Sequence, residues 1–442
     1  MATNNNNPTA NADTKKEEKK DIIMVDIKPE EFDLEAYSNN YSGHAKILRL
    51  MFIGEHCKSL EVEALKAAVE EVKKTLNSAL YKTLMEKIGG RAGPNYVLDQ
   101  SWIDATDKKA AQTQERLELE LNTYRANLIK ESIRLGQHEL GDFHYNRGDL
   151  NSALKCYVKT RDYCTTPKHI IQMCLHVIRA SIELGNYAHV VNYVAKAEQT
   201  SDVSDKVVVA KLKIAAGLAQ LQNRKYKLAA RKFLETTIDL GSNYNDVIAP
   251  QDVAVYGGLC ALATFDRSEL KKKVIDSTTF RPFLELTPEV RELITDFYAS
   301  KYASCLKYLD RLRNGLLLDI FLHEHVEVLY QKIRNKALVQ YFSPFTSVDL
   351  NLMAEAFNTN VPGLEKELTR LIMDGSIQAR IDSHNKRLYA RQTDQRSATF
   401  QKTLEMGQEY QDNSKALLLR VSMLKNDVVV KPQRRDDKDK NK

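Results

Sequence analysis

The sequence is poor in the residues that interrupt helices. It contains 17 glycines and 10 prolines among 442 residues, and tryptophan occurs once, as Trp102. Glycine and proline are the strongest helix breakers. A chain this poor in them, with 43% apolar and 28% charged residues, is therefore typical of a mainly helical globular protein. At roughly 150 residues per domain, the length allows two or three packed units.

Long apolar runs and paired cysteines are also missing. The longest apolar stretch, Leu316–Leu322, is broken by Asp319 and is too short to cross a bilayer. The N-terminus lacks the apolar core of a signal peptide. None of the six cysteines lies in a Cys-x-x-Cys pair or at zinc-finger spacing from histidines, so we expect reduced core thiols. These features predict a protein of the cytoplasm and nucleus that does not enter membranes.

The excess of positive charge is small and confined to the C-terminal end. The net charge is +6, and residues 380–442 hold 15 Lys/Arg against 9 Asp/Glu, which is already a difference of +6. Residues 1–379 are therefore neutral overall. Nucleic-acid binding requires a concentrated basic surface, and the charge totals imply no broad one outside the tail.

No group of residues in the sequence forms a catalytic motif. The one metal-like cluster is His323-Glu324-His325. A zincin requires a second histidine four residues after the first, where Glu327 stands. A JAMM isopeptidase follows its two histidines with Ser and Asp, at the places that Ile333 and Lys336 occupy here. We interpret these histidines as solvated or capping residues, and we expect no catalytic residue, no cofactor site and no metal site.

Periodicity and chain breakers divide the sequence into six segments. Both ends, 1–20 and 429–442, are polar or highly charged and are expected to be disordered. Between them we predict an N-terminal helical region (21–106), TPR-like helical repeats (107–320), a winged-helix module (321–395) and a C-terminal helix (396–428).

The N-terminal region combines a short β-rich stretch with helices. The β-rich stretch is Ile22–Ile27, and amphipathic periodicity predicts helices over 45–57 and 62–88. A Gly-rich break follows at 89–94. A long helix is then expected from about Asp107, just after Trp102.

An internal repeat is the most informative feature of the sequence. Three segments share a helix, a short polar turn and a second helix, and aligning Leu150, Tyr187 and Tyr226 gives spacings of 37 and 39 residues. This period is close to the roughly 34-residue TPR repeat. Looser fourth and fifth units centre on 266–270 and 301–302. Stacked helix pairs build a continuous core and an extended binding surface, so we predict a right-handed TPR-like array in preference to coincidental helical hairpins.

A change of pattern after Ser343-Pro344-Phe345 predicts a winged helix. Short helices are expected over 348–357 and 363–373. Apolar residues that alternate with polar ones then indicate a half-buried strand, and the turn 383–386 returns into a second strand. With the helix expected before the break, over 326–340, this makes three helices followed by a hairpin, which is the order of a winged helix, a variant of helix-turn-helix.

The helix predicted over 363–373 does not fit DNA recognition. Its Glu365, Lys366, Glu367 and Arg370, with Asp374, sum to −1, whereas a helix in the major groove carries Arg, Lys or Asn toward the bases. We therefore expect no specific DNA binding. Four basic residues near the hairpin leave weak RNA contact open: Arg380, Lys386, Arg387 and Arg391.

The last predicted helix, over 398–425, has an apolar stripe with no core left to cover. Such a stripe indicates pairing with helices of partner proteins. The stripe consists of Met406, Tyr410, Leu417, Val421 and Leu424.

This succession of helical repeats, winged helix and C-terminal helix resembles the PCI family. Its members are scaffold subunits of the proteasome lid, the COP9 signalosome and a translation initiation factor complex. Four stretches, Leu50–Cys57, Ser101–Asp104, Gly141–Tyr163 and Tyr341–Asp349, are most similar to a signalosome member of the family in its plant form.

The resemblance implies a non-catalytic scaffold in a complex that removes a ubiquitin-like modifier from cullins and so regulates cullin-RING ubiquitin ligases. In that family the metal-dependent isopeptidase lies on a different, JAMM/MPN-domain subunit. Expected partners are other PCI-domain subunits, JAMM/MPN-domain subunits and cullin-RING ligases.

The family also implies which surfaces meet the other subunits. PCI modules join side by side through their winged-helix sheets, and their C-terminal helices gather in a bundle. By position the bundle role falls on the apolar stripe of the last helix, and the sheet role falls on Ile377, Ala379, Ile381, Arg387 and Tyr389.

Two alternatives remain open. One is the equivalent PCI subunit of the proteasome lid, which shares this architecture. The other is an RNA-associated PCI protein of translation or mRNA export, which predicts salt-sensitive RNA binding by residues 344–442.

Overall fold

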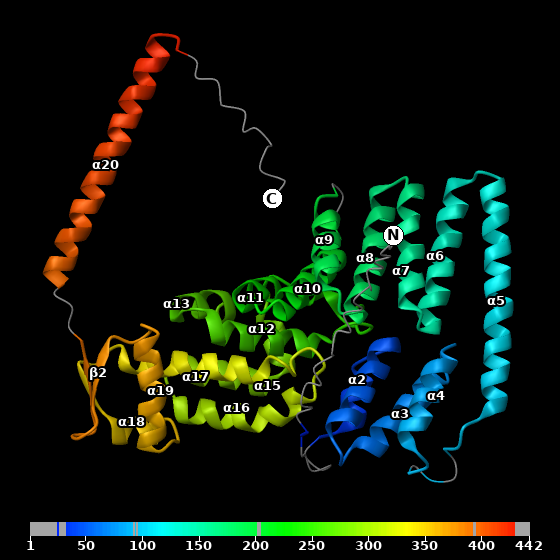
Figure 1. The fold of residues 1–442 in the computed structure, drawn as a ribbon, viewed down its shortest axis with the longest axis horizontal. Coiled ribbons are helices and arrows are strands. Elements are labelled where there is room, and N and C mark those ends of the chain that lie inside the picture. The colour runs from blue at the N-terminus through cyan, green and yellow to red at the C-terminus, as the bar shows by residue number, and fades with distance from the viewer. Residues whose placement is uncertain are drawn as a thin grey trace, which may run out of the picture. The chain divides into compact units, whose positions relative to one another are not determined.

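The computed structural model describes residues 24–25, 32–91, 93, 96–200, 205–391 and 395–428, and these residues are mainly helical (Figure 1). The predicted tails and most of the stretch Ile22–Ile27 lie outside the described residues. The chain forms two compact units: unit 1 extends to Tyr341 and includes Ala356–Asn358, and unit 2 contains the rest. Among the described residues, no helix is both long enough and apolar enough to cross a membrane.

The first five helices of unit 1 differ from the prediction in two places. The single helix expected over 62–88 is wrong, because the chain turns at Lys73–Asn77 and the Asn77 side chain caps a new helix by accepting from the Leu80 N–H at 3.0 Å. The five helices are α1 (Leu34–Asn39), α2 (Gly43–His56), α3 (Glu61–Val72), α4 (Ser78–Ile88) and α5 (Gln100–Ala126).

Helix α5 also begins earlier than expected, at Gln100 rather than near Asp107. The Asp99 carboxylate caps it by accepting the Trp102 N–H at 3.0 Å, a common way to satisfy the free N–H groups of a first turn. Trp102 therefore lies inside the helix.

The three predicted repeat hairpins form as expected. They are α6 (Lys130–Arg147) with α7 (Leu150–Lys159), α8 (Pro167–Glu183) with α9 (Tyr187–Glu198), and α10 (Lys206–Gln222) with α11 (Tyr226–Leu234). In Figure 1 the helices α5 to α8 stand side by side.

The turns of these hairpins share one backbone geometry. In each, the residue two positions before the second helix has a positive φ: Gly148 at 86°, Gly185 at 69° and Arg224 at 59°. Its N–H donates to the carbonyl three residues back, and the next N–H donates five residues back, which satisfies the free carbonyls of the first helix. Ser300, at 63°, repeats this pattern between α15 and α16. The turn near Asp266 does not.

In two of the hairpins the helices pack closely because a glycine on the first helix faces an aromatic ring on the second. A Cβ added to Gly141 of α6 would lie 2.6 Å from the Tyr157 ring of α7, and one added to Gly217 of α10 would lie 2.7 Å from the Phe233 ring of α11. Both glycines stand sixteen residues before their aromatic partner. The first and third hairpins therefore pack alike, which supports the repeat.

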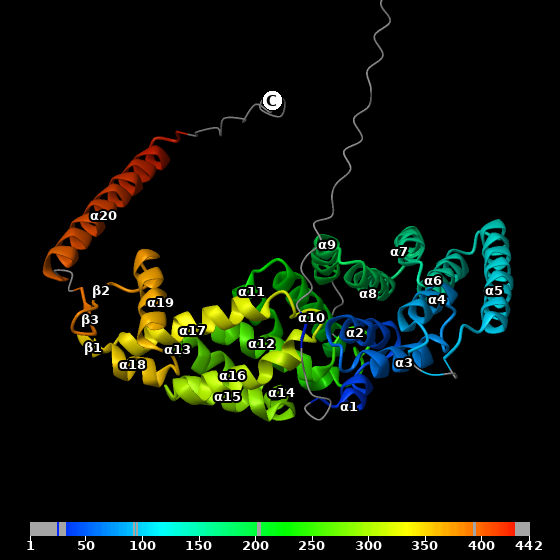
Figure 2. The same cartoon turned by 60° about the horizontal axis from the view of Figure 1, so that its bottom comes forward.

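The remainder of unit 1 consists of further helical pairs. Figure 2 shows α15 and α16 side by side. The elements of this part are η3 (Ile238–Leu240), α12 (Pro250–Thr264), α13 (Arg267–Leu270), the π-helical turn η4 (Lys271–Ile275), α14 (Arg281–Leu286), α15 (Pro288–Tyr298), α16 (Tyr302–Leu317) and α17 (Val326–Phe342); the short η2 (Thr160–Tyr163) lies earlier, between α7 and α8.

Unit 2 contains a three-stranded antiparallel sheet in the order β1-β3-β2. Leu388 of β3 is fully buried and lies opposite Val348 of β1 and Ile381 of β2. The helix predicted over 348–357 is wrong at its start, where strand β1 precedes a shorter helix. The elements are β1 (Ser347–Asp349), α18 (Leu350–Ala356), α19 (Val361–Met373), β2 (Ala379–Asp382), β3 (Arg387–Ala390) and α20 (Gln395–Lys425).

Candidate functional site: assembly surfaces and a buried polar junction

The sheet of unit 2 has two open edges. The Arg391 N–H donates to Gln378 O at 2.9 Å, and the Leu350 N–H donates to Lys386 O at 2.8 Å. Pairing alternates along antiparallel strands, so the other backbone groups of β1 and β2 point away from β3. These outward groups belong to Ser347 and Asp349 in β1 and to Ala379 and Ile381 in β2.

The five predicted sheet residues divide between the two faces of the sheet. Ile377 and Ala379 are buried and Ile381 is half-buried, so their side chains belong to the core of the module. Arg387 and Tyr389 lie on the exposed face. Without opening the module, a partner can reach the backbone at the edges and the face that carries Arg387 and Tyr389, but not the side chains of Ile377 and Ala379.

The predicted stripe of α20 is exposed along its whole length. Met406, Tyr410, Leu417, Val421 and Leu424 are between 53% and 77% exposed. Outside this stripe, Leu418 and Leu419 are also exposed, at 68% and 63%.

A regular spacing of three and four residues runs through this helix. Most positions of the series are apolar, and the rest include Gly407 and Ser414, which are small. This is the spacing of a coiled-coil seam. The series is Phe400, Thr403, Gly407, Tyr410, Ser414, Leu417, Val421 and Leu424.

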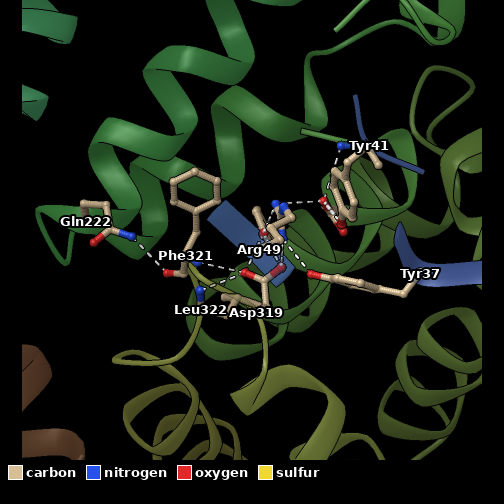
Figure 3. A network of polar contacts seen from close by, with 10 residues as sticks. Tyr37, Tyr41, Arg49, Gln222, Asp319, Phe321 and Leu322 are labelled. Carbon is tan, nitrogen blue, oxygen red and sulfur yellow. Dashed lines mark hydrogen bonds and ion pairs between the residues drawn. The ribbon is translucent and has the colours of Figure 1, made fainter. Parts of the chain in front are cut away.

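Unit 1 contains a buried ion network that no local pattern in the sequence indicates (Figure 3). At its centre Arg49 of α2, 2% exposed, donates from Nη1 to Asp319 Oδ2 at 2.7 Å and from Nη2 to Asp252 Oδ2 at 3.2 Å. The Tyr41 ring lies 4.1 Å below the guanidinium carbon. Arginine suits this place because its planar fork can bond two carboxylates at once.

Tyrosines and backbone groups complete the hydrogen bonding of both carboxylates. Tyr41 donates to Asp252 at 2.7 Å, and Tyr256 donates to Asp319 at 2.7 Å. The backbone N–H groups of Phe321 and Leu322 also donate to Asp319. The network joins the N-terminal helices to residues more than 200 positions later in the chain.

Burial without full neutralisation shifts the protonation of this network. Burial raises the pKa of Asp252 to about 6, against the opposing effect of the Arg49 cation. The two carboxyl groups share one guanidinium. If both were ionised, one buried negative charge would have no cation of its own, which is costly in such a site.

A second buried cluster lies beside a cavity of about 580 Å³. Tyr145 donates to Glu183 Oε1, and Arg179 donates to Asp246 Oδ2 at 3.2 Å while lying over the Tyr145 ring. Burial raises the pKa of Glu183 to about 7. Glu183 and Asp246 line the cavity together with Phe52 and Phe321. Each of these two carboxyl groups has a hydrogen-bond partner within the chain.

One side-chain group among the described residues has the composition of a metal site. His138 and Asp142 of α6 and His176 of α8 place their ligand atoms within 4.8 Å of one another. Arg179 Nη2, however, lies 3.5 Å from His176 Nδ1 and 3.8 Å from Asp142 Oδ1. The positive charge of Arg179 would repel a metal ion at this place. Its guanidinium also contacts Nδ1 of His176, a nitrogen that a metal ion would otherwise bind. The cluster therefore fits a hydrogen-bonded group better than a metal centre.

The His323–His325 pair has a structural role. The interpretation of both as solvated or capping residues is wrong for His325, which is 1% exposed and contacts Tyr226 Oη at 3.2 Å through Nδ1. His323 Nδ1 lies 2.7 Å from Leu317 O, as a capping residue would. Long-range burial of His325 has no signature in the local sequence.

All six cysteines are free thiols, and five of them are buried. Burial raises the pKa of Cys260 and of Cys305 to about 12. Thiols with a raised pKa are poor nucleophiles, in agreement with a core role.

Three family models match successive parts of the chain. The model of 26S proteasome subunit RPN7 matches residues 99–273, the PCI domain model matches 302–392, and the model of the C-terminal helix of COP9 signalosome complex subunit 1 matches 395–421. The last match falls within α20.

Full-length relatives decide the family. COP9 signalosome complex subunit 1 of Arabidopsis thaliana is 56% identical over 412 residues, which cover 92% of this chain and 93% of the relative. The chain belongs to the family of COP9 signalosome complex subunit 1. Subunit 1b of Drosophila melanogaster is 44% identical over 95% of this chain and 90% of its own length.

The proteasome alternative is distant by comparison. The 26S proteasome non-ATPase regulatory subunit 6 of Dictyostelium discoideum is 23% identical over 78% of this chain and 88% of its own length. The signalosome subunit 1 family therefore accounts for more of the sequence, including its C-terminal helix.

Proposed function

We propose that this chain is a non-catalytic scaffold subunit of a COP9 signalosome, the complex that removes the ubiquitin-like modifier from cullins and so regulates cullin-RING ligases. The observation that carries the proposal is the exposed apolar seam of α20, in the helix that matches the signalosome C-terminal helix model. Exposed apolar surface of this extent marks an association site.

The open sheet edges of unit 2 support a second contact. Outward backbone groups of β1 and β2 offer hydrogen bonds to a strand of a neighbouring PCI module, by β-augmentation. The exposed face with Arg387 and Tyr389 lies on the same sheet. On this proposal the isopeptidase resides on a JAMM/MPN-domain partner, and the complex acts in the cytoplasm and the nucleus.

The proposal is tested by purifying the tagged full chain from cells under native conditions. We expect it to co-purify with cullin-modifier removal that a metal chelator abolishes, while the recombinant chain alone shows no turnover. Recovery with proteasome core particles would support the lid alternative instead. Recovery with RNA only, in a salt-sensitive manner, would support the RNA alternative.

A further inference from the structure

A local concentration of positive charge is hidden by the neutral total of residues 1–379. Between Lys206 and Leu234, eight side chains are basic and none is acidic. Most of these basic residues lie on α11 or on the turn before it. Helix α11 buries Tyr226, Ala229 and Phe233 against the repeat core, so its charged residues face outward.

The π-helical turn η4 adds three consecutive exposed lysines to this surface. Glu269 joins the two elements, because it pairs with Lys227 of α11 at 3.4 Å and with Lys273 of η4 at 3.5 Å. We call the combined surface the α11 basic face. It consists of Arg224, Lys225, Lys227, Leu228, Arg231 and Lys271–Lys273.

The basic face leaves most of its charge without a partner carboxylate inside the face. It contains seven basic side chains and borders on Glu269, and that one carboxylate is shared by two of them. π-Helical turns are rare and often occur at functional sites. A surface with this charge attracts an acidic partner over a distance of about one Debye length, roughly 8 Å at physiological ionic strength.

An exposed leucine within the face distinguishes between classes of acidic partner. Leu228 is 45% exposed and lies on the outer side of α11, one turn before Arg231. Single-stranded nucleic acids stack on exposed aromatic rings, yet every aromatic side chain from Arg224 to Ile275 is buried. A leucine among lysines and arginines instead suits a protein segment that combines carboxylates with an apolar side chain.

We propose that the α11 basic face binds an acidic segment of a partner protein, with a large apolar side chain of that segment against Leu228. The face is separate from the seam of α20 and from the sheet of unit 2. The interaction is electrostatically steered and salt-sensitive, and its apolar contact provides the specificity.

The test measures binding of the full chain to a fluorescein-labelled peptide of Glu and Asp with one central Leu, by fluorescence anisotropy. We expect the triple variant Lys225→Glu, Arg231→Glu, Lys272→Glu to lose about tenfold or more in affinity. A matched triple reversal on α5 and α6, Lys108→Glu, Lys109→Glu, Lys130→Glu, changes the net charge equally at exposed lysines and should leave binding within about twofold.

A second variant tests the apolar contact and does not depend on the charge reversals. Leu228→Gln should weaken binding of the leucine peptide severalfold and leave unchanged the binding of the same peptide with Gln at its centre. The proposal is overturned if both triple variants weaken binding equally, if Leu228→Gln has no effect, or if a single-stranded RNA probe binds the same face more tightly than the leucine peptide. Thermal melting of each variant confirms that it is folded.

Discussion

Arg49 shows how a single residue holds distant parts of unit 1 together. Its guanidinium bonds both Asp252 and Asp319, which stand 203 and 270 positions later in the sequence. We predict that Arg49→Ala destabilises the protein by about 3–5 kcal/mol, because it leaves two buried carboxylates without a cation. Chemical denaturation of the full chain measures this change.

Arg91 provides the matched control for Arg49. It also forms two bonds with one carboxylate, that of Glu61, but its side chain is 54% exposed. Arg91→Ala should cost less than about 1 kcal/mol. Equal losses for the two variants would contradict the role given to the buried network.

Glu183 should make the stability of the protein depend on pH. Its folded pKa is raised to about 7 from an ordinary value of 4.5, so the folded state holds a proton that the unfolded state has released. The wild-type free energy of unfolding should therefore fall, relative to that of Glu183→Gln, as the pH rises from about 5 to about 8, by up to roughly 3 kcal/mol.

The glutamine variant keeps the acceptor for the Tyr145 hydroxyl and removes only the titration. Urea denaturation at several pH values compares the two proteins. A difference in stability that does not change with pH would show that Glu183 does not titrate in this range.

At the scale of elements, the close approach of paired helices depends on small residues. Gly217→Ala places a Cβ 2.7 Å from the Phe233 ring, and we predict a destabilisation of about 1–3 kcal/mol from overpacking. Gly315→Ala in α16 is the control, because nothing lies within 4 Å of its added Cβ. It should be neutral or slightly stabilising through helix propensity. Thermal denaturation distinguishes the two; a neutral Gly217→Ala would contradict the tight packing.

We predict that substitutions on the two sides of helix α20 differ in their effect on partner binding. Leu417 lies on the heptad seam, whereas Leu419, exposed to a similar degree at 63% against 61%, points about 200° away around the helix. Leu417→Glu should reduce co-purification of partner subunits roughly tenfold, and Leu419→Glu should leave it nearly unchanged. Equal effects would mean that the seam does not define the contact. Both side chains are exposed in the chain, so neither change should alter its stability.

Local signals explain which elements could be predicted from the sequence. The hairpin turns carry Gly148 and Gly185, and the apolar spacing after each turn repeats. By contrast β1 spans only three residues, too few for alternation to be visible. The alternation that predicted a half-buried strand agrees with the burial of Ile377 and Ala379, whereas the family resemblance assigned both residues to a subunit contact.

The whole molecule contains features that no local pattern predicts. The Arg49 network depends on long-range contacts, and a lone arginine in an apolar helix gives no sign of its partners. The handedness of the repeat array and the six segment boundaries stay predictions. The basic face arises from residues on two elements, and the charge total of the chain conceals it.

Scaffold function is a property of the whole molecule, and native mass spectrometry of the tagged full chain purified from cells measures it. We predict a single assembly that contains several other PCI-domain subunits and a subunit with an intact JAMM motif, and that loses this chain when residues 395–428 are deleted. A chain that is recovered alone, or only with proteasome subunits, would contradict the assignment to a signalosome scaffold.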